Sequence, residues 1–324
     1  MTGKYIMLVI YGPTASGKTD LAIRLARKFN GEIISADSRQ VYKGLDIGTG
    51  KVSFGAKVGK HDGYWIVDAV RINGFDLVEA GQQFTAADFL TFASTTMIRI
   101  IVTKKLPIVV GGTGFYIKAL IEGIGSIGVK PDWQLRRKLE KLDTSTLYQK
   151  LLEIDQDRAK RLNDSDRKNP RRLIRAIEIV LNKSQVARDQ SQVTDPWPLA
   201  TGDYLLIGLT APNSYLYKRA DEWLDNRLNH GMIEEVESLI KRGVTINWLE
   251  NLGLEYRWIS RYLKKQLDYN QMVERLRGDI HSFIRRQKMW FNKFEKIKLF
   301  DISNKDWQKK LEKRISLWYT RVND

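Results

Sequence analysis

Residues 12–19 read Gly12-Pro13-Thr14-Ala15-Ser16-Gly17-Lys18-Thr19, and this stretch decides the fold. It matches the Gly-x-x-x-x-Gly-Lys-Ser/Thr pattern of phosphate-binding loops. Such a loop surrounds phosphate oxygens with backbone N–H groups and adds the positive end of the helix that follows. We therefore expect these eight residues to bind a polyphosphate, with the Lys18 charge at the terminal phosphate and the Thr19 hydroxyl on Mg²⁺.

The sequence on either side of the loop supports this interpretation. Tyr5–Tyr11 is a continuous apolar run, which predicts a strand buried on both faces. Thr19–Phe29 carries apolar residues at one-face spacing, which predicts an amphipathic helix. Strands alternating with helices predict an α/β fold with a doubly wound parallel sheet, of the P-loop NTPase-like class. The further strands are expected at Glu32–Ala36, Leu106–Val110, Leu205–Leu209 and Lys298–Ile302.

The middle of the chain has a different pattern. Gly44–Phe75 contains several glycines and is expected to form loops with short strands. Residues 130–190 are rich in charge and helical in period, and Asn169-Pro170 is a typical helix start. Residues 184–203 have the composition of a linker. We expect three segments: a first part of a catalytic core at 1–121, a helical insertion domain at 122–200, and a second core part at 201–324.

Composition narrows the possible functions. The chain of 324 residues has no cysteine, which excludes disulfides, thiolate metal sites and a cysteine nucleophile. Its 54 Lys and Arg against 38 Asp and Glu give a formal net charge of +16, which fits either a nucleic-acid partner or a need for solubility. No apolar run is long enough for a membrane span, and the N-terminal apolar stretch leads into the phosphate loop. We expect a cytoplasmic protein with no membrane partner.

Two strand ends carry candidate chemistry. Asp37 follows the strand Glu32–Ala36, at the sheet edge where open α/β sheets bind ligands. It is a candidate general base or Mg²⁺ ligand, and a turn residue is the alternative. The strand Leu106–Val110 runs into Gly111-Gly112-Thr113-Gly114 and lacks the acid that kinases and NTPases place there. Either this turn brings Thr113 to a second phosphate, or the glycines serve close packing alone.

Several segments together resemble the tRNA dimethylallyltransferases, also called tRNA isopentenyltransferases. The first are GPTASGKT, SADSRQVYKGLDIGTGK (Ser35–Lys51) and VVGGTGFYIKAL (Val109–Leu120). In the same order as in the family follow NPRRLIRAIEI (Asn169–Ile179), GMIEEV (Gly231–Val236), LGLEYR (Leu252–Arg257) and RRQKMWF (Arg285–Phe291). The resemblance covers roughly residues 5–300.

The resemblance implies a reaction. The loop would hold the pyrophosphate of dimethylallyl diphosphate, and the prenyl group would go to N6 of adenosine 37, beside the anticodon, in tRNAs that read codons beginning with U. Asp37 would be the general base, while Lys18, Thr113 and Mg²⁺ on Thr19 would stabilise the leaving group. The adenine would leave its stack to react, and the helical insertion would swing over the tRNA. We expect a monomer that binds the anticodon stem-loop.

The resemblance also implies a set of tRNA-binding residues. They are Asp37, Ser38, Arg39, Gln40 and Thr113 near the loop, Arg136, Arg171, Arg172 and Arg175 in the insertion, and Arg257, Arg285, Arg286, Gln287 and Lys288 near the end. Residues 257–298 hold 12 Lys and Arg against four acids. We expect a buried stripe there at Leu276, Ile280, Phe283, Trp290 and Phe294. Arg277, His281, Arg285 and Lys288 would lie on another face, towards RNA or solvent.

The sequence departs from the family pattern at two positions. The family typically has an arginine for pyrophosphate eight residues before the glycine of GMIEEV, where this chain has Trp223. Arg219 and Arg227 lie one turn on either side and are the candidates to replace it. The family often has glycine where this chain has Glu255, and we expect that carboxylate to face the tRNA backbone and weaken contact there.

Two other functions remain open on the sequence. A P-loop small-molecule or nucleoside kinase would need ATP and a phosphate-linked acid other than Asp37. A non-enzymatic RNA-binding protein would not need the intact Gly17-Lys18-Thr19 and Asp37.

Overall fold

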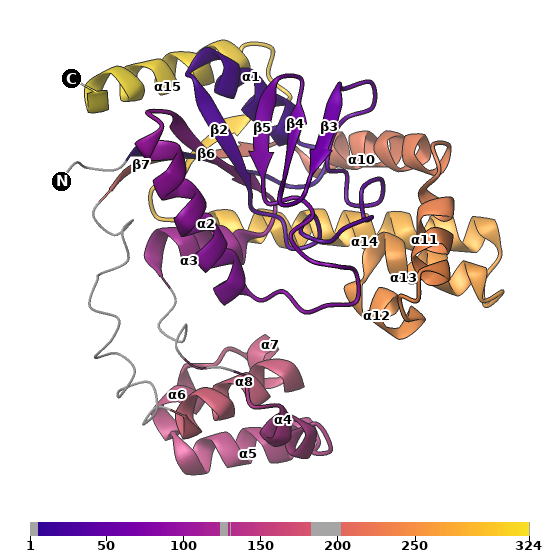
Figure 1. Ribbon diagram of the computed structural model, residues 1–324. Helices are drawn as coiled ribbons and strands as arrows, with labels where there is room; N and C mark the ends of the chain where they lie inside the picture. The colour runs from indigo at the N-terminus through magenta and orange to yellow at the C-terminus, as the bar shows by residue number, and fades with distance from the viewer. Residues whose placement is uncertain (1–5, 124–128, 130, 183–201, 324) are drawn as a thin grey trace. The chain divides into compact units, whose positions relative to one another are not determined.

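The computed structural model describes residues 6–123, 129, 131–182 and 202–323, and the chain forms two compact units (Figure 1). The core unit comprises Met1–Glu122 and Leu199–Asp324, and the insertion unit comprises Gly123–Pro198. Tyr5, the predicted start of the first strand, and residues 184–201 of the predicted linker lie outside the described residues. Asp203, which we placed at the end of the linker, already begins a strand.

The core unit contains an eight-stranded sheet with the order β3-β4-β5-β2-β6-β1-β7-β8. Every pair from β5 to β8 is parallel, which confirms the predicted α/β fold with its largely parallel sheet. Leu8, Val9 and Ile10 of β1 are fully buried because this strand lies inside the sheet. The strands are β1 (Ile6–Tyr11), β2 (Gly31–Ser35), β3 (Val58–His61), β4 (Tyr64–Val67), β5 (Val70–Asn73), β6 (Leu106–Gly111), β7 (Asp203–Thr210) and β8 (Lys298–Asp301).

The sheet is not parallel throughout. β3, β4 and β5 pair antiparallel and extend one edge, in the region where we expected loops with short strands. β3 is exposed along its whole length, so its sequence carries no alternation of apolar and polar residues. Asp68 and Ala69, at φ 47° and 68°, form the two-residue turn between β4 and β5. A turn with two positive φ values usually contains glycine, so this turn could not be predicted from Asp68-Ala69.

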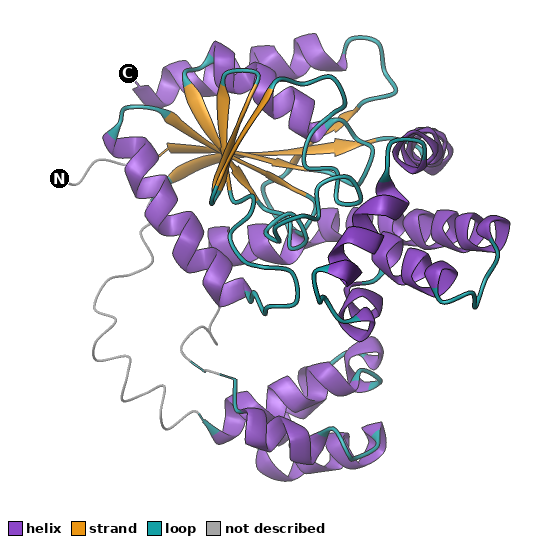
Figure 2. Cartoon of the chain, turned by 45° about the vertical axis from the view of Figure 1, so that its right-hand side comes forward, coloured by secondary structure: helices purple, strands orange, loops and turns teal. Residues whose placement is uncertain are grey.

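Helices cover both faces of the sheet (Figure 2). Leu21 and Leu25 of α1 pack in one core with Leu8 and Ile10 of β1. On the other face, Phe89 of α2 stacks on Tyr116 of α3 with ring centroids 4.2 Å apart. The helices of this unit are α1 (Lys18–Lys28), α2 (Ala86–Val102), α3 (Gly114–Glu122), α10 (Asn213–Leu228), α11 (Met232–Lys241), α12 (Ile246–Leu252), α13 (Leu254–Leu263), α14 (Tyr269–Met289) and α15 (Trp307–Asn323).

α14 differs from the predicted basic helix. It ends at Met289, and a 3₁₀ turn follows at Trp290–Lys293, so Trp290 and Phe294 do not belong to its stripe. Phe283 is only half-buried because Ile284, one position on, points into the core. The stripe that the helix buries consists of Met272, Leu276, Ile280, Ile284 and Gln287.

The insertion unit is helical where it is described. The Asn169 side chain caps α8 by accepting a hydrogen bond from Arg172 N at 3.3 Å, and Pro170 opens the helix, as predicted. Leu147 and Leu151 pack with Leu173 in a separate small core. The helices are α4 (Trp133–Leu139), α5 (Thr144–Ile154), α6 (Gln156–Arg161), α7 (Asp164–Arg167) and α8 (Pro170–Leu181). In the described part of either unit, no helix has the length and apolarity to cross a membrane.

Candidate active site

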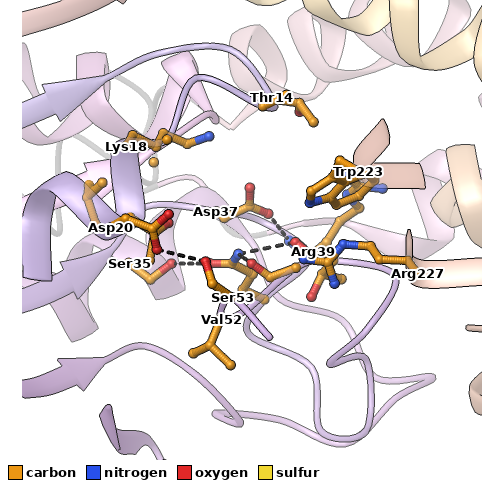
Figure 3. A pocket seen from close by; sticks show the side chains of 18 of the residues that line it. Thr14, Lys18, Asp20, Ser35, Asp37, Arg39, Val52, Ser53, Trp223 and Arg227 are labelled. Carbon is orange, nitrogen blue, oxygen red and sulfur yellow. Dashed lines mark hydrogen bonds between the residues drawn. The ribbon is translucent and has the colours of Figure 1, made fainter. Parts of the chain in front are cut away.

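A cavity of about 430 Å³ lies at the carboxyl ends of β1, β2 and β6 (Figure 3). The strand order places β6 between β1 and β2, so residues that follow these strands meet at one edge. The structure thus brings Asp37 and the phosphate loop to one cavity. Its lining includes Thr14, Ala15, Gly17, Lys18, Thr19, Asp20, Asp37, Arg39, Gln40, Phe54, Val110, Gly111, Arg219, Trp223 and Arg227.

The phosphate loop has the backbone that its sequence predicts. Ala15 and Gly17 have φ values of 62° and 75°, and Ser16 N donates to Pro13 O at 3.2 Å, so the chain turns tightly before α1. Lys18 Nζ donates to Pro13 O at 3.3 Å. Burial lowers the pKa of Lys18, and the negative charge of Asp37 partly offsets this effect. A bound diphosphate would supply the counter-charge that this ammonium needs.

Asp37 lies just beyond the carboxyl end of β2. Ala36 N donates to Val110 O at 2.7 Å, which fixes the backbone just before Asp37. Asp37 Oδ1 accepts a hydrogen bond from Arg39 N at 2.9 Å. Figure 3 shows its carboxylate between Lys18 and Arg39. One oxygen is thus anchored by the main chain, which orients the group as a general base requires.

Arg39 and Glu255 form an ion pair beside Asp37. Arg39 Nη1 lies 2.5 Å from Glu255 Oε2, and the guanidinium lies 5.6 Å from the ring centre of Phe283. Burial lowers the pKa of Arg39, but the charges of Glu255 and Asp37 outweigh this and raise it. Glu255 is 1% exposed, so our expectation that it faces tRNA is wrong. Gly253 and Leu254, where α12 ends and α13 begins, have positive φ values of 83° and 47°.

Arg219 and Arg227, the two candidates for the pyrophosphate arginine, have different surroundings. Arg219 Nε donates to Ala15 O of the phosphate loop at 2.8 Å. Arg227 is 4% exposed, donates to Ile47 O, and has its guanidinium 4.2 Å from the ring centre of Trp223. Burial lowers the pKa of Arg227 to about 10. Both line the cavity, but Arg219 is the one bonded to the loop.

Sequence reasoning missed the residues that fix the loop 44–51. Glu235 accepts hydrogen bonds from the N–H groups of Asp46, Ile47 and Gly48, at 2.8, 2.6 and 3.0 Å. Tyr256 OH donates to the same carboxylate at 2.9 Å. Burial raises the pKa of Glu235. Glu235 and Tyr256 lie in GMIEEV and LGLEYR, so the motifs marked these positions without revealing what they contact.

The Gly111–Gly114 turn serves packing. A Cβ at Gly111 would collide with the main chain of Ala36, and one at Gly114 with the ring of Trp290. Thr113 N donates to Ala36 O at 3.2 Å, and its hydroxyl accepts from Ser38 N at 3.1 Å. Thr113 is not among the residues that line the cavity, and its role at a second phosphate stays a prediction.

The expected basic row on α14 faces α10. Arg277 pairs with Asp225 at 2.6 Å and His281 with Asp221 at 2.9 Å. Arg285 donates to Tyr217 OH at 2.8 Å. Lys288 donates to Ala211 O and Asn213 Oδ1, both at 2.8 Å. Oxygens of the segment 211–225 therefore bind the residues of this row, but Arg285 remains exposed, and the role of the row in tRNA binding stays a prediction.

The remaining residues that we expected to contact tRNA differ in how far they are exposed. Arg286 is exposed, and Arg257 is half-buried with Asp279 3.8 Å away. Gln287 is 3% exposed, so we withdraw it from the surface that meets tRNA. Gln40 Nε2 donates to Thr49 O and Gly50 O, both at 3.2 Å, and so supports the cavity wall.

The insertion arginines also have internal partners. Arg136 binds the buried carboxylate of Glu178 through two hydrogen bonds, at 2.8 and 2.7 Å. Arg175 binds Glu178 as well and donates to Val129 O at 2.9 Å. Arg172 pairs with Asp166. Arg171 and Arg172 are exposed at the start of α8, whereas Arg136 and Arg175 chiefly hold the helices together.

Comparisons with known proteins identify relatives of this chain. The family model described as IPP transferase matches residues 40–294. A tRNA dimethylallyltransferase 1 of Geotalea uraniireducens is 38% identical over 90% of this chain and 89% of its own. A tRNA dimethylallyltransferase of Acetivibrio thermocellus is 36% identical over 96% of both chains. The crystal structure of a tRNA isopentenylpyrophosphate transferase from Bacillus halodurans is 28% identical, with a TM-score of 0.68 over 99% of this chain and 97% of its own. The chain belongs to the IPP transferase family.

Proposed function

We propose that this protein transfers the dimethylallyl group of dimethylallyl diphosphate to N6 of adenosine 37 in tRNAs that read codons beginning with U. The observation that carries the proposal is the meeting of Asp37 and an intact phosphate loop at one cavity to which β6 brings no acid. Val110 and Gly111 line the cavity at the end of β6. A kinase would need a carboxylate there to hold the metal of ATP, so the kinase alternative is not favoured.

The residues of the cavity suit this chemistry. The exocyclic amine of adenine is a poor nucleophile because its lone pair is delocalised into the ring. As N6 attacks C1 of the prenyl group, the C1–O bond to diphosphate breaks, and Asp37 accepts the N6 proton. Lys18 and the loop N–H groups stabilise the charge that grows on the leaving diphosphate. Arg219, bonded to Ala15 O, is the arginine that we assign to this task in place of Trp223.

Mg²⁺ fits the same cavity. The Thr19 hydroxyl and the carboxylates of Asp20 and Asp37 line it. Mg²⁺ usually keeps several waters and binds one or two protein oxygens with substrate phosphates. Thr19 would hold the ion, which would supply further positive charge to the diphosphate when bound.

The proposal extends to the partner and the setting. The tRNA would present its anticodon stem-loop, with the target adenine extruded into the cavity. Residues 122–200 would form the insertion domain that contacts the tRNA, between the core parts 1–121 and 201–324. Arg171, Arg172, Arg257 and Arg286 would contact phosphates, and Ser38 and Arg39 would lie near the base that reacts. We propose a monomer that works in the cytoplasm, where tRNA is modified.

Mass spectrometry of tRNA nucleosides tests the proposal. After incubation with dimethylallyl diphosphate and Mg²⁺, the tRNA should contain N6-isopentenyladenosine, in amounts that ATP neither supports nor reduces. ATP consumption coupled to modification would favour the kinase class. Binding of tRNA without any modified adenosine would favour the non-enzymatic RNA-binding protein.

A further inference from the structure

The last turn of α14 lies between the two turns that follow β1 and β6. Gln287 Oε1 accepts hydrogen bonds from Thr14 N at 2.8 Å and Thr14 Oγ1 at 3.3 Å. Its Nε2 donates to Gly112 O at 3.1 Å. Its main-chain oxygen accepts a hydrogen bond from Tyr11 OH at 2.5 Å. One side-chain amide therefore joins the phosphate loop to the Gly111–Gly114 turn.

The amide is matched to both partners. Thr14 N can only donate and Gly112 O can only accept, so the site needs one acceptor and one donor on the same side chain. Glutamine provides both, whereas glutamate offers no donor when ionised and methionine offers only a weak acceptor. Gln287 is 3% exposed, so loss of either bond would leave a covered polar group without a partner.

Gly112 makes room for this contact. A Cβ at Gly112 would collide with Nε2 of Gln287, the far end of a flexible side chain. The φ of Gly112 is not positive, so alanine fits the backbone there. Adding one methyl group at position 112 would thus push the amide away from Thr14 without straining the turn.

We propose that Gln287 is a positioning residue that sets the phosphate loop for the diphosphate of the prenyl donor, by fixing Thr14 against Gly112. The inference rests on the proposed function. Thr14 lines the cavity and Gln287 does not, so Gln287 acts through the loop and touches neither substrate. The helix that carries it also holds Arg286 of the expected tRNA surface, so one helix supports both substrates.

Steady-state kinetics of Gln287→Ala, Gly112→Ala and the double variant test this. Gln287→Ala should raise the KM for dimethylallyl diphosphate about three- to tenfold at saturating tRNA, and leave the KM for tRNA unchanged. Gly112→Ala should raise the donor KM by a similar factor because the displaced amide loses its hydrogen bonds with Thr14. In the Gln287→Ala background the added methyl meets no amide, so the double variant should be no worse than Gln287→Ala.

Met289→Ala is the matched control, since Met289 lies in the same turn and is 67% exposed. It should leave the donor KM unchanged. A rise in the tRNA KM alone for Gln287→Ala would overturn the proposal and show a direct tRNA contact. Additive effects of the two substitutions would overturn it as well. If the wild-type protein modifies no tRNA, the proposed function fails, and calorimetry with inorganic pyrophosphate still decides the inference: Gln287→Ala must weaken its binding several-fold.

Discussion

The cavity and the basic segments of α8 and α14 hold their charges in different ways. In the cavity the ion pair of Arg39 and Glu255 is shielded from water, because the two side chains are only 12% and 2% exposed. On α14 the pair of Arg277 and Asp225 is open to water, because the two side chains are 41% and 50% exposed. Water and salt screen exposed pairs, whereas buried charges interact strongly. One substitution should therefore have a large effect in the cavity and a small one on the basic surface.

The largest effect is expected at Asp37. Asp37→Asn keeps an oxygen that can accept from Arg39 N but removes the base, so kcat should fall by about 10²–10⁴. The KM for tRNA should change little. Single-turnover measurements of isopentenyladenosine formation would check this, with Glu222→Gln as a control that also lines the cavity. Near-normal turnover of Asp37→Asn would remove Asp37 from the role of base.

Glu255→Gln tests the buried pair itself. It would leave Arg39, whose side chain is 12% exposed, without its bonded carboxylate, and should lower the free energy of unfolding by about 3–5 kcal/mol. Chemical denaturation measures the loss. Glu274→Gln, at an exposed position of α14, should be neutral. Replacing the pair by Arg39→Met with Glu255→Leu should recover most of the stability, since no charge then stays unpaired. Equal losses for the two glutamates would contradict the comparison between cavity and surface.

Lys18→Ala should lower kcat/KM for the prenyl donor by about 10²–10³, the range for loss of one group that stabilises developing charge. Lys28→Ala, at the far end of α1, is the control. The protonated form of Lys18 is the active one, and burial lowers its pKa. The alkaline fall in kcat/KM should therefore begin at a lower pH than an exposed lysine would give. If kcat/KM stayed constant up to the pH at which exposed lysines lose their proton, Lys18 would not be the group that binds the donor.

The same comparison explains what the sequence could predict. Apolar runs located β1, β2, β6, β7 and β8, and the strand-end rule placed Asp37 beside the loop. The bounds of β3 could not be predicted because an exposed edge strand has no apolar pattern. The pairs of residues that shape the cavity could not be predicted from the sequence because their members are distant in the chain. Arg39 and Glu255 are 216 positions apart, and Thr14 and Gln287 are 273 apart. A charge pattern shows that arginines line up on a helix, but not whether the neighbouring helix brings acids to them.

The smallest effects per residue are expected on the basic surface, where the test is the dependence on salt. Arg171 and Arg172 begin α8, and Arg286 with Arg257 represents the core unit. Each phosphate contact releases counterions, so the logarithm of tRNA affinity should fall linearly with the logarithm of salt concentration. Neutralising Arg171 with Arg172, or Arg257 with Arg286, to glutamine should raise the KM for tRNA and flatten that slope by about 1 per lost contact. The KM for the prenyl donor should not change, because that ligand binds at the loop.

Lys309→Gln with Lys310→Gln removes the same charge from exposed positions of α15 and should leave the slope as it is. If this control flattened the slope equally, the effect would come from net charge; if neither arginine pair altered it, those arginines would only be solvated.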